Sequence, residues 1–332
     1  MSSSKILVFG GGSVGAILIY LLSKAIDISN VVVVCRSNYD SVAQNGYTID
    51  STVYGTGLNV KPIAVRSVKE AAQVCPNGFD YICLTTKAIH NGNVSQAEMI
   101  RPAVSSRTMI CLAQNGIGIE KPYRDVFPDN PIASIVIYMP CTQTAPGVVS
   151  HTNYAKFMLG TYPANSPSEH LSAVDQLTEM LNHGGATAVH EKDVQLARWM
   201  KLLVNGAYNP ICALSRLRDV QFLGSSTGAQ AFLRKVMSEI ASIARAEGFK
   251  EVDESVVDRQ LGISAGRGPP GVEPSMMADA LAGSHLEIES IVGNALRIAQ
   301  SRGVECPRLE TIYYLAKGLD MSFEIPDALQ GK

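Results

Sequence analysis

The sequence predicts an α/β domain followed by an all-helical domain, and two observations support this fold class. In the first half, short β-branched runs alternate with helical stretches, which is typical of a parallel sheet covered by helices on both faces. In the second half the helical periods become long, after the pair Gly184–Gly185 and a charged step at 191–193. We therefore expect domains at residues 1–190 and 191–332, in keeping with roughly 150 residues per domain.

The individual elements follow from the same patterns. Near-continuous apolar runs predict buried parallel strands at 6–9, 31–35, 81–85, 109–112 and 132–138. Segments 147–151 and 156–160 resemble an antiparallel extension, and 186–190 is expected to be a last short strand. Helical periods predict helices at 194–215, 228–247, 276–302 and 308–319. The Gly/Pro-rich segment 265–274 is expected to be a loop, because proline is not tolerated inside a helix.

Composition and charge exclude several classes of protein. Hydrophobic residues make up 46% of the 332 residues, which is enough for a large core and excludes global disorder. The 28 Lys and Arg residues against 30 Asp and Glu leave a net charge of −2, so we expect neither nucleic acid nor a membrane as a partner. The seven widely spaced cysteines form no CxxC and the six histidines no HxxH. We therefore expect a cytoplasmic protein that binds no metal.

A glycine-rich loop joins the first expected strand to the first helix. Its residues are Gly10, Gly11, Gly12, Ser13, Val14 and Gly15. In the GxGxxG pattern, the first glycine permits a tight turn, the second lets the backbone approach a pyrophosphate, and the third lets the helix pack on the strand. The N–H groups at the start of the helix then face the phosphates. The position between strand and helix predicts a Rossmann-type dinucleotide site at these six residues.

The end of the second strand indicates which dinucleotide binds. An NAD site usually has an acidic residue about twenty positions after the glycines, whereas this chain has Arg36. An arginine can donate two parallel hydrogen bonds from its guanidinium group to a 2′-phosphate, so we expect NADP(H). The same glycines also satisfy GxSxG at Ser13, and residues 224–228 satisfy it again. A serine hydrolase is the weaker alternative, because Ser13 follows the very first strand and no HGGG-like loop exists.

A polar stripe crosses an otherwise apolar helix. Lys201, Asn205 and Asn209 lie at i, i+4 and i+8, and buried asparagines are unfavourable unless they have partners. A lysine in such a stripe can donate a proton to a carbonyl oxygen as hydride reaches the carbon. The alternative is a solvated surface face, which the apolar flanking residues disfavour.

A second stripe is expected further along the chain. Its members are Asp279, Gly283 and Glu287, with Ser275 one turn earlier. A lysine and a carboxylate on facing helices, with a hydroxyl and amides nearby, could hold a small polar oxo acid. An exposed helix face remains the alternative for the two acidic residues.

Taken in order, the motifs resemble those of the ketopantoate reductase (2-dehydropantoate 2-reductase) family. They are GGGSVG at 10–15, Arg36, TTKA at 85–88, QNGIG at 114–118, GVVSH at 147–151, Lys201 with Asn205 and Asn209–Pro210, SMMAD at 275–279, and Glu287–Ile288. Each piece is common, but the ordered set is specific and spans nearly the whole chain.

The resemblance implies a Rossmann domain followed by a helical domain like the C-terminal domain of 6-phosphogluconate dehydrogenase. It implies NADPH-dependent reduction of 2-dehydropantoate to (R)-pantoate, a step of pantothenate biosynthesis. By resemblance Lys201 is the proton donor, and the substrate is bound by Asn205, Asn209, Ser275 and Asn115. The residues at the nicotinamide end of the cofactor are Lys87, Asn115 and Glu287.

Two residues depart from the family pattern. Asp219 stands where the family often has a substrate-binding asparagine, and Pro274 replaces a serine. A carboxylate beside an anionic substrate would repel it unless Asp219 turns away or pairs with Arg216 or Arg218. A reductase of another small 2-oxo acid using NAD(P)H therefore remains an alternative. A homodimer is a separate open possibility. A non-catalytic NADP(H)-sensing protein is disfavoured because it would not need Lys201.

Overall fold

The computed structural model describes residues 3–89 and 94–325, and the chain divides into two compact units. The sheet unit comprises Met1–Gln114 and Ile119–Val194, and the helical unit comprises Asn115–Gly118 and Gln195–Lys332. The expected α/β domain followed by a helical domain is confirmed. The expected limits at 1–190 and 191–332 differ from this division at 115–118 and 191–194, and they stay a prediction for the domains.

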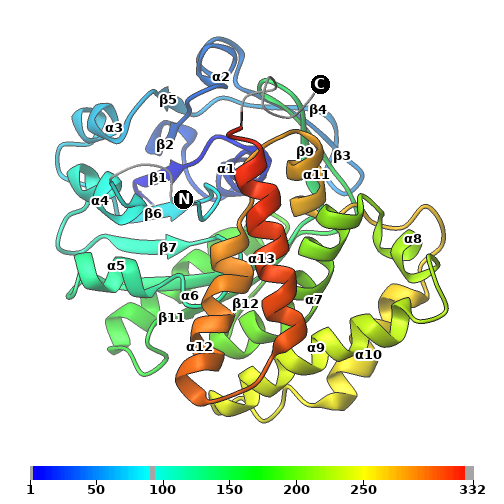
Figure 1. Ribbon diagram of the computed structural model, residues 1–332. Coiled ribbons are helices and arrows are strands. Elements are labelled where there is room, and N and C mark those ends of the chain that lie inside the picture. The colour runs from blue at the N-terminus through cyan, green and yellow to red at the C-terminus, as the bar shows by residue number, and fades with distance from the viewer. Residues whose placement is uncertain (1–2, 90–93, 326–332) are drawn as a thin grey trace. The chain divides into compact units, whose positions relative to one another are not determined.

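The sheet unit is built on an eight-stranded sheet in the order β12-β11-β8-β7-β6-β1-β2-β5 (Figure 1). Its strands are β1 (Ile6–Phe9), β2 (Val31–Val34), β5 (Ile63–Val65), β6 (Tyr81–Leu84), β7 (Met109–Leu112), β8 (Ile132–Tyr138), β11 (Lys156–Thr161) and β12 (Thr187–His190). Neighbouring strands are parallel except β11 and β8, which are antiparallel. The expected parallel strands and the antiparallel addition at 156–160 are therefore confirmed.

A second sheet of four strands was not expected. Its order is β4-β3-β10-β9, with β3 (Tyr47–Ser51), β4 (Gly55–Val60), β9 (Cys141–Ala145) and β10 (Val148–His151). The expectation that 147–151 extends the main sheet is wrong, because β10 pairs parallel with β3 and antiparallel with β9. The sequence predicts a strand at 147–151 but not the strand with which it pairs. The partner β3 lies about a hundred positions earlier in the chain, and no local pattern indicates such a distant pairing.

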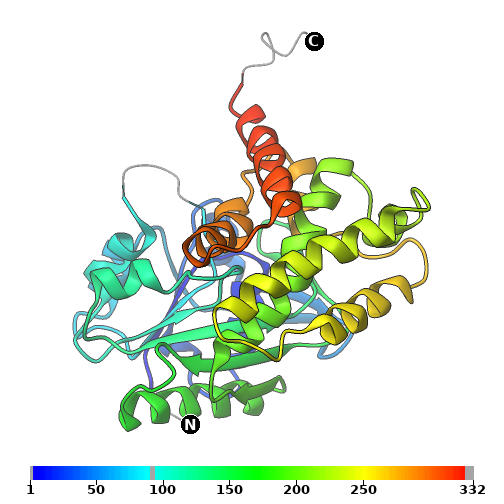
Figure 2. The ribbon, with the colours of Figure 1, turned by 60° about the horizontal axis from the view of Figure 1, so that its bottom comes forward.

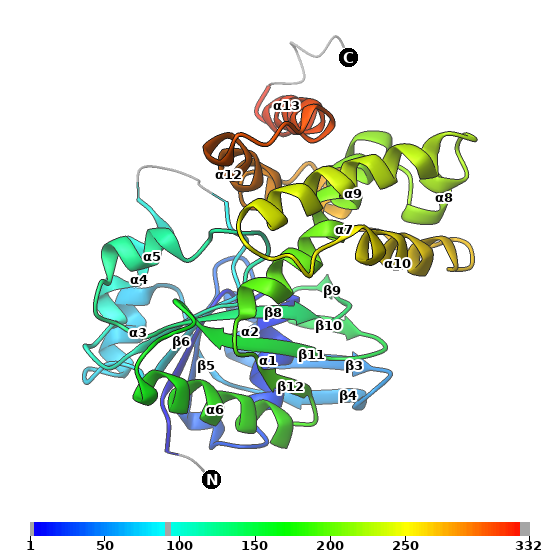
Figure 3. The same cartoon turned by 90° about the horizontal axis from the view of Figure 1, so that it is seen from below.

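Helices cover both faces of the main sheet, as alternate side chains of the strands require. The helices of the sheet unit are α1 (Ser13–Leu22), α2 (Tyr39–Asn45), α3 (Val68–Val74), α4 (Gln96–Ile100), α5 (Lys121–Val126) and α6 (Ser168–His183), with 3-10 turns η1 (Ile28–Asn30) and η2 (Arg101–Ala103). Val31 and Val33 join the core with α1 and α6, whereas Val32 and Val34 join the core with α3, α4 and α5. Figure 3 shows α6 along the strand pair β11 and β12.

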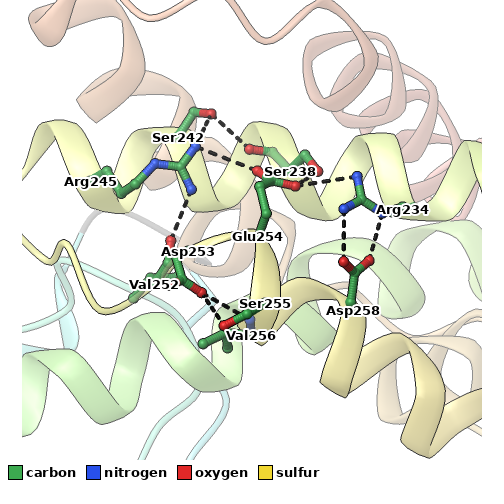
Figure 4. A network of polar contacts seen from close by, with 10 residues as sticks. All are labelled: Arg234, Ser238, Ser242, Arg245, Val252, Asp253, Glu254, Ser255, Val256 and Asp258. Carbon is green, nitrogen blue, oxygen red and sulfur yellow. Dashed lines mark hydrogen bonds and ion pairs between the residues drawn. The ribbon is translucent and has the colours of Figure 1, made fainter.

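The helical unit packs its helices around one apolar core. Its helices are α7 (Val194–Ser215), α8 (Asp219–Leu223), α9 (Ala229–Ala246), α10 (Glu254–Ala265), α11 (Ser275–Leu281), the π-helical turn η3 (Glu289–Gly293), α12 (Asn294–Arg302) and α13 (Pro307–Ser322). In Figure 2, α9 and α10, drawn in yellow tones, lie side by side, and they are in contact. Arg234 on α9 is bound to Asp258 on α10, and Arg245 on α9 donates to the carbonyl of Val252, just before α10 (Figure 4). Among the described residues, no helix has the length and apolar character needed to span a membrane.

The expectation of a single helix over 276–302 is wrong. The first helix, α11, ends at Leu281, and Gly283 adopts a left-handed conformation with φ of 61°. The Ser284 amide donates to the Asp279 carbonyl at 2.9 Å and the Gly283 amide to Ala280 at 3.3 Å. This is the hydrogen-bond pattern of a glycine helix stop. Asp279, Gly283 and Glu287 therefore do not form a stripe on one helix.

Candidate functional site

The glycine-rich loop of the sheet unit is shaped by close backbone contacts. Gly10 has φ of 127°, and a Cβ there would lie 2.6 Å from the Thr86 nitrogen. A Cβ on Gly15 would overlap the Gly10 carbonyl oxygen, so helix α1 can lie this close to the turn only with glycine. At Gly12, by contrast, no atom of the described residues lies within 4 Å of such a Cβ. The loop is therefore tight where it packs and open at the start of α1, and Ser13 and Val14 form the first turn of that helix.

The carbonyl of Gly11 is held by two side chains from neighbouring elements. Asn38 Nδ2 donates to this oxygen at 2.7 Å, and the Tyr47 hydroxyl donates at 3.2 Å. Asn38 is itself fixed by a reciprocal amide pair with Gln143, at 2.6 and 3.0 Å. Asn38 and Tyr47 were not predicted from the sequence. An asparagine two residues after Arg36 at the end of the second strand was the only available signal.

Arg36 and Lys87 follow the carboxyl ends of two strands of the main sheet. Arg36 comes after β2 and is exposed. Lys87 comes after β6, is also exposed, and its carbonyl accepts from Gln96 Nε2 at 2.7 Å. Parallel strands end at the same edge, which is where ligands bind in open α/β sheets. The structure thus places both predicted cations at the edge that carries the glycine loop.

Within the helical unit, the structure brings together three of the predicted residues. Lys201 Nζ on α7 donates to Asn115 Oδ1 at 2.8 Å. Asn115 Nδ2 in turn donates to Glu287 Oε2 at 3.5 Å, and the Glu287 side chain is buried. The amide of Asn115 thus connects the ammonium group to the carboxylate.

The surroundings of Lys201 lower its pKa from 10.5 to about 8. Burial makes the largest contribution because it disfavours the charged form, and the positive charge of Arg198 adds to it. The carboxylate of Glu287 acts in the opposite direction. A lysine with this pKa remains mostly protonated near neutral pH but releases its proton far more readily than an exposed one.

Asn205 and Asn209 continue along α7 from Lys201, as predicted from their spacing. Asn209 is 4% exposed, and its Nδ2 has no hydrogen-bond partner among the described residues. Leaving a buried donor unsatisfied costs about 1–3 kcal/mol, so this atom is suited to an acceptor supplied by a ligand. Ser275 is exposed at the first position of α11, directly after Pro274.

Asp219 does not pair with Arg216 or Arg218. Its buried carboxylate forms an ion pair with Arg267 and accepts from the Val272 amide at 2.6 Å. Its own amide donates to the Val272 carbonyl at 3.1 Å. Asp219 therefore fastens the 265–274 loop to the start of α8. Neither Arg267 nor Val272 was predicted, because both lie about fifty positions from Asp219.

The predicted site residues fall into both units. Those in the sheet unit are Gly10, Gly11, Gly12, Ser13, Val14, Gly15, Arg36 and Lys87, and those in the helical unit are Asn115, Lys201, Asn205, Asn209, Ser275 and Glu287. No group of three or more His, Cys, Asp or Glu side chains that could hold a metal ion occurs in residues 3–89 and 94–325.

The chain matches a family model along most of its length. Residues 6–164 match the model described as ketopantoate reductase PanE/ApbA, and residues 193–320 match its C-terminal counterpart. An uncharacterized protein of Saccharomyces cerevisiae is 33% identical over 94% of this chain and 92% of its own length.

Solved structures have the same fold. The structure of 2-dehydropantoate 2-reductase from Methylococcus capsulatus is 32% identical, covers 97% of this chain and 98% of its own, and has a TM-score of 0.84. D-mandelate dehydrogenase, solved with NADH and anilino(oxo)acetate, is 20% identical, covers 97% and 100%, and has a TM-score of 0.81; this likeness shows the fold alone. With both halves matched by the family models, the chain belongs to the ketopantoate reductase family.

Proposed function

We propose that this protein is an NADPH-dependent reductase that converts 2-dehydropantoate to (R)-pantoate. The observation that carries the proposal is the hydrogen bond between Lys201 and Asn115, which holds a proton donor on the helix face that also bears two asparagines. Membership of the family supports the class of reaction, and the name of the Methylococcus capsulatus relative supports the substrate.

Lys201 is the residue to which we assign the proton chemistry. The nicotinamide cofactor, when bound, supplies hydride to the carbonyl carbon of the 2-oxo acid. The carbonyl oxygen then needs one proton to become the hydroxyl group of the product, and the Lys201 ammonium provides it. Because the pKa of Lys201 is about 8, the side chain is mostly protonated at pH 7. The neutral amine left behind takes up a proton from solvent before the next turnover.

The substrate is assigned to the side chains that continue the stripe. The unpartnered Nδ2 of Asn209 can donate to a carboxylate or hydroxyl oxygen, and Asn205 lies one turn closer to Lys201. Ser275 can add a hydroxyl group from the start of α11. Asn115, which already orients Lys201, is assigned to both the substrate and the nicotinamide end.

The cofactor is assigned to the carboxyl edge of the main sheet. The open position at Gly12 and the N–H groups at the start of α1 fit a pyrophosphate, with Ser13 and Val14 in the first turn. Arg36 fits the 2′-phosphate that distinguishes NADPH from NADH. We assign Lys87, Asn115 and Glu287 to the nicotinamide end.

A second candidate is reduction of a different small 2-oxo acid. The ion pair of Asp219 with Arg267 favours it, because this pair replaces the amide that the family resemblance leads one to expect. A non-catalytic NADP(H)-sensing protein is disfavoured, because it would not need Lys201 as a proton donor.

The test is a steady-state assay of the purified protein with 2-dehydropantoate, pyruvate, 2-oxoisovalerate and phenylglyoxylate, each with NADPH and NADH. We expect the highest kcat/KM for 2-dehydropantoate with NADPH. Lys201→Ala should reduce it by about 10²–10⁴-fold, as for loss of a positioned general acid, while cofactor binding stays unchanged. Lys235→Ala on the exposed face of α9 is the control and should behave as wild type. Higher activity on another acid would support the second candidate, and no turnover with any would refute both.

A further inference from the structure

Arg198 is a buried cation one turn before Lys201 on α7. Its side chain is 3% exposed, although arginine is among the residues least often found in a protein core. Burying a guanidinium is unfavourable unless its N–H groups are satisfied. One of them, Nη1, donates to the carbonyl oxygen of Gly116 at 3.0 Å. The bond joins α7 to a segment that lies 82 positions earlier in the chain.

Arg198 contacts the segment Asn115–Gly118. This segment belongs to the helical unit although the residues on either side of it in the sequence belong to the sheet unit, and we call it the excursion. The Ile117 amide donates to the Ser290 carbonyl at 3.0 Å, and Asn294 Nδ2 donates to the Ile117 carbonyl at 2.6 Å. Gly116 has φ of 105°, and a Cβ there would overlap the carbonyl group of Ser290. The turn η3 and helix α12 therefore hold one end of the excursion, and Arg198 holds the peptide next to Asn115.

That peptide determines where the side chain of Asn115 points. Consecutive Cα atoms are fixed about 3.8 Å apart, so a shift of the Gly116 carbonyl moves Asn115 as well. Asn115 contacts Lys201 on one side and Glu287 on the other. Without a fixed backbone, its amide could rotate away from the ammonium group.

We propose that Arg198 is a positioning residue of the reductase site, which holds Asn115 in place through the Gly116 carbonyl and thereby orients Lys201. The proposal rests on the function proposed above. Arg198 also has an electrostatic effect, since its charge disfavours the protonated form of Lys201 while Glu287 favours it. Loss of Arg198 should therefore both loosen the excursion and raise the pKa of Lys201.

The test compares Arg198→Met with Arg245→Met. Arg245 lies on α9, is about one third exposed, and also donates to a backbone carbonyl, that of Val252, at 3.0 Å (Figure 4). Both variants lose an arginine–carbonyl bond of the helical unit, but only Arg198 contacts the excursion. We expect Arg198→Met to lower kcat by about 10–100-fold, the usual effect of losing a charge-assisted hydrogen bond, and to change the Kd for NADPH much less, because the phosphate contacts of the cofactor are assigned to the glycine loop and Arg36. Arg198→Lys, which retains the charge and a donor, should recover most of the loss, and Arg245→Met should keep the wild-type kcat.

Two measurements need no turnover and so separate this proposal from the proposed function. Hydrogen exchange should accelerate at the Ile117 amide in Arg198→Met but not in Arg245→Met. Competitive acylation of Lys201 across a pH series should show its pKa rising only in the Arg198 variant. If no 2-oxo acid is reduced by the wild type, these two results still decide the role of Arg198.

A double-mutant cycle provides the strictest criterion. If Arg198 acts through Asn115, its replacement should cost little further activity in an Asn115→Ala background. Fully additive losses, or equal behaviour of the Arg198 and Arg245 variants, would overturn the proposal. Should Arg198→Met not fold, Gly116→Ala displaces the same peptide from the Ser290 side, and unchanged Lys201 acylation in that variant would equally overturn it.

Discussion

Asp219 and Arg267 form an ion pair that ties the Gly/Pro-rich loop to the start of α8. The carboxylate is 2% exposed and is further bound by the backbone amides of Val220 and Val272, at 2.7 and 2.6 Å. The residue that departs from the family pattern is therefore part of the scaffold of the loop that precedes Ser275, and its charge is already compensated.

Replacing this carboxylate should affect stability more than substrate affinity. Asp219→Asn removes the charge that Arg267 and two amides share, and we expect unfolding in urea to show a loss of about 1–2 kcal/mol. This loss is small for a charged hydrogen bond because the Arg267 side chain is 37% exposed and water screens the pair. KM for the 2-oxo acid should not fall.

The matched control is Asp258→Asn, which breaks the ion pair with Arg234 where both side chains are exposed. Exposed pairs contribute little because water screens their charges, so this variant should be nearly as stable as wild type. A lower KM in Asp219→Asn, with unchanged stability, would show that the carboxylate faces the substrate after all.

The pKa of Lys201 predicts how the reaction depends on pH. Burial and the charge of Arg198 lower this pKa to about 8 against the opposing effect of Glu287. Because the protonated form is the active one, kcat/KM should be level below pH 7 and fall tenfold per unit well above pH 8. Lys201→Arg keeps its proton throughout this range and should lack the basic limb, whatever activity it retains. A wild-type basic limb near the ordinary lysine pKa would contradict the assignment.

Arg36 is expected to discriminate between the two nicotinamide cofactors. Arg36→Ala removes the charge-assisted bonds to a 2′-phosphate, so calorimetry should show about 10–150-fold weaker NADPH binding and almost no change for NADH. Arg107 is exposed just before β7, at the opposite edge of the sheet, and Arg107→Ala should bind both cofactors normally. Equal losses for NADPH and NADH in the Arg36 variant would refute its role.

Asn38 should affect both cofactors alike. Asn38→Leu removes one of the two side-chain hydrogen bonds to the Gly11 carbonyl and leaves Gln143 without its amide partner. Because the pyrophosphate is common to both cofactors, we expect NADPH and NADH each to bind about tenfold more weakly in fluorescence titrations. Asn59→Leu is the control, since Asn59 donates to the carbonyls of Asn45 and Tyr47 in the same unit. A change in the ratio of the two affinities would mean that Asn38 acts through Arg36 instead.

Local patterns were sufficient for some features of the fold and site. The apolar runs located the parallel strands, and the spacing of Lys201, Asn205 and Asn209 placed them on one helix, which the structure has at Val194–Ser215. The glycine loop lies between β1 and α1, as the order of apolar run, glycines and helical stretch predicts. By contrast, the spacing of Asp279, Gly283 and Glu287 predicts a helical stripe, but the left-handed Gly283 follows the end of the helix.

The features that sequence reasoning missed depend on distant partners. Arg198 and Gly116, Asp219 and Arg267, and strands β10 and β3 are each separated by about fifty to a hundred positions. Such pairs form because packing brings their elements together, and no periodicity within either segment reports it. The one local signal for Arg198 was its position among apolar residues of α7, where a charged side chain is unusual.

The placement of Asn115–Gly118 with the helices also limits how chains of this family can recombine. A chimaera made by a single crossover near residue 190 would combine the excursion of one parent with the Arg198, Ser290 and Asn294 of another. The four residues and their three anchors belong to one structural unit although they lie far apart in the sequence. Exchange of the helical half alone should therefore give active hybrids only between parents that have the same residues at positions 115–118.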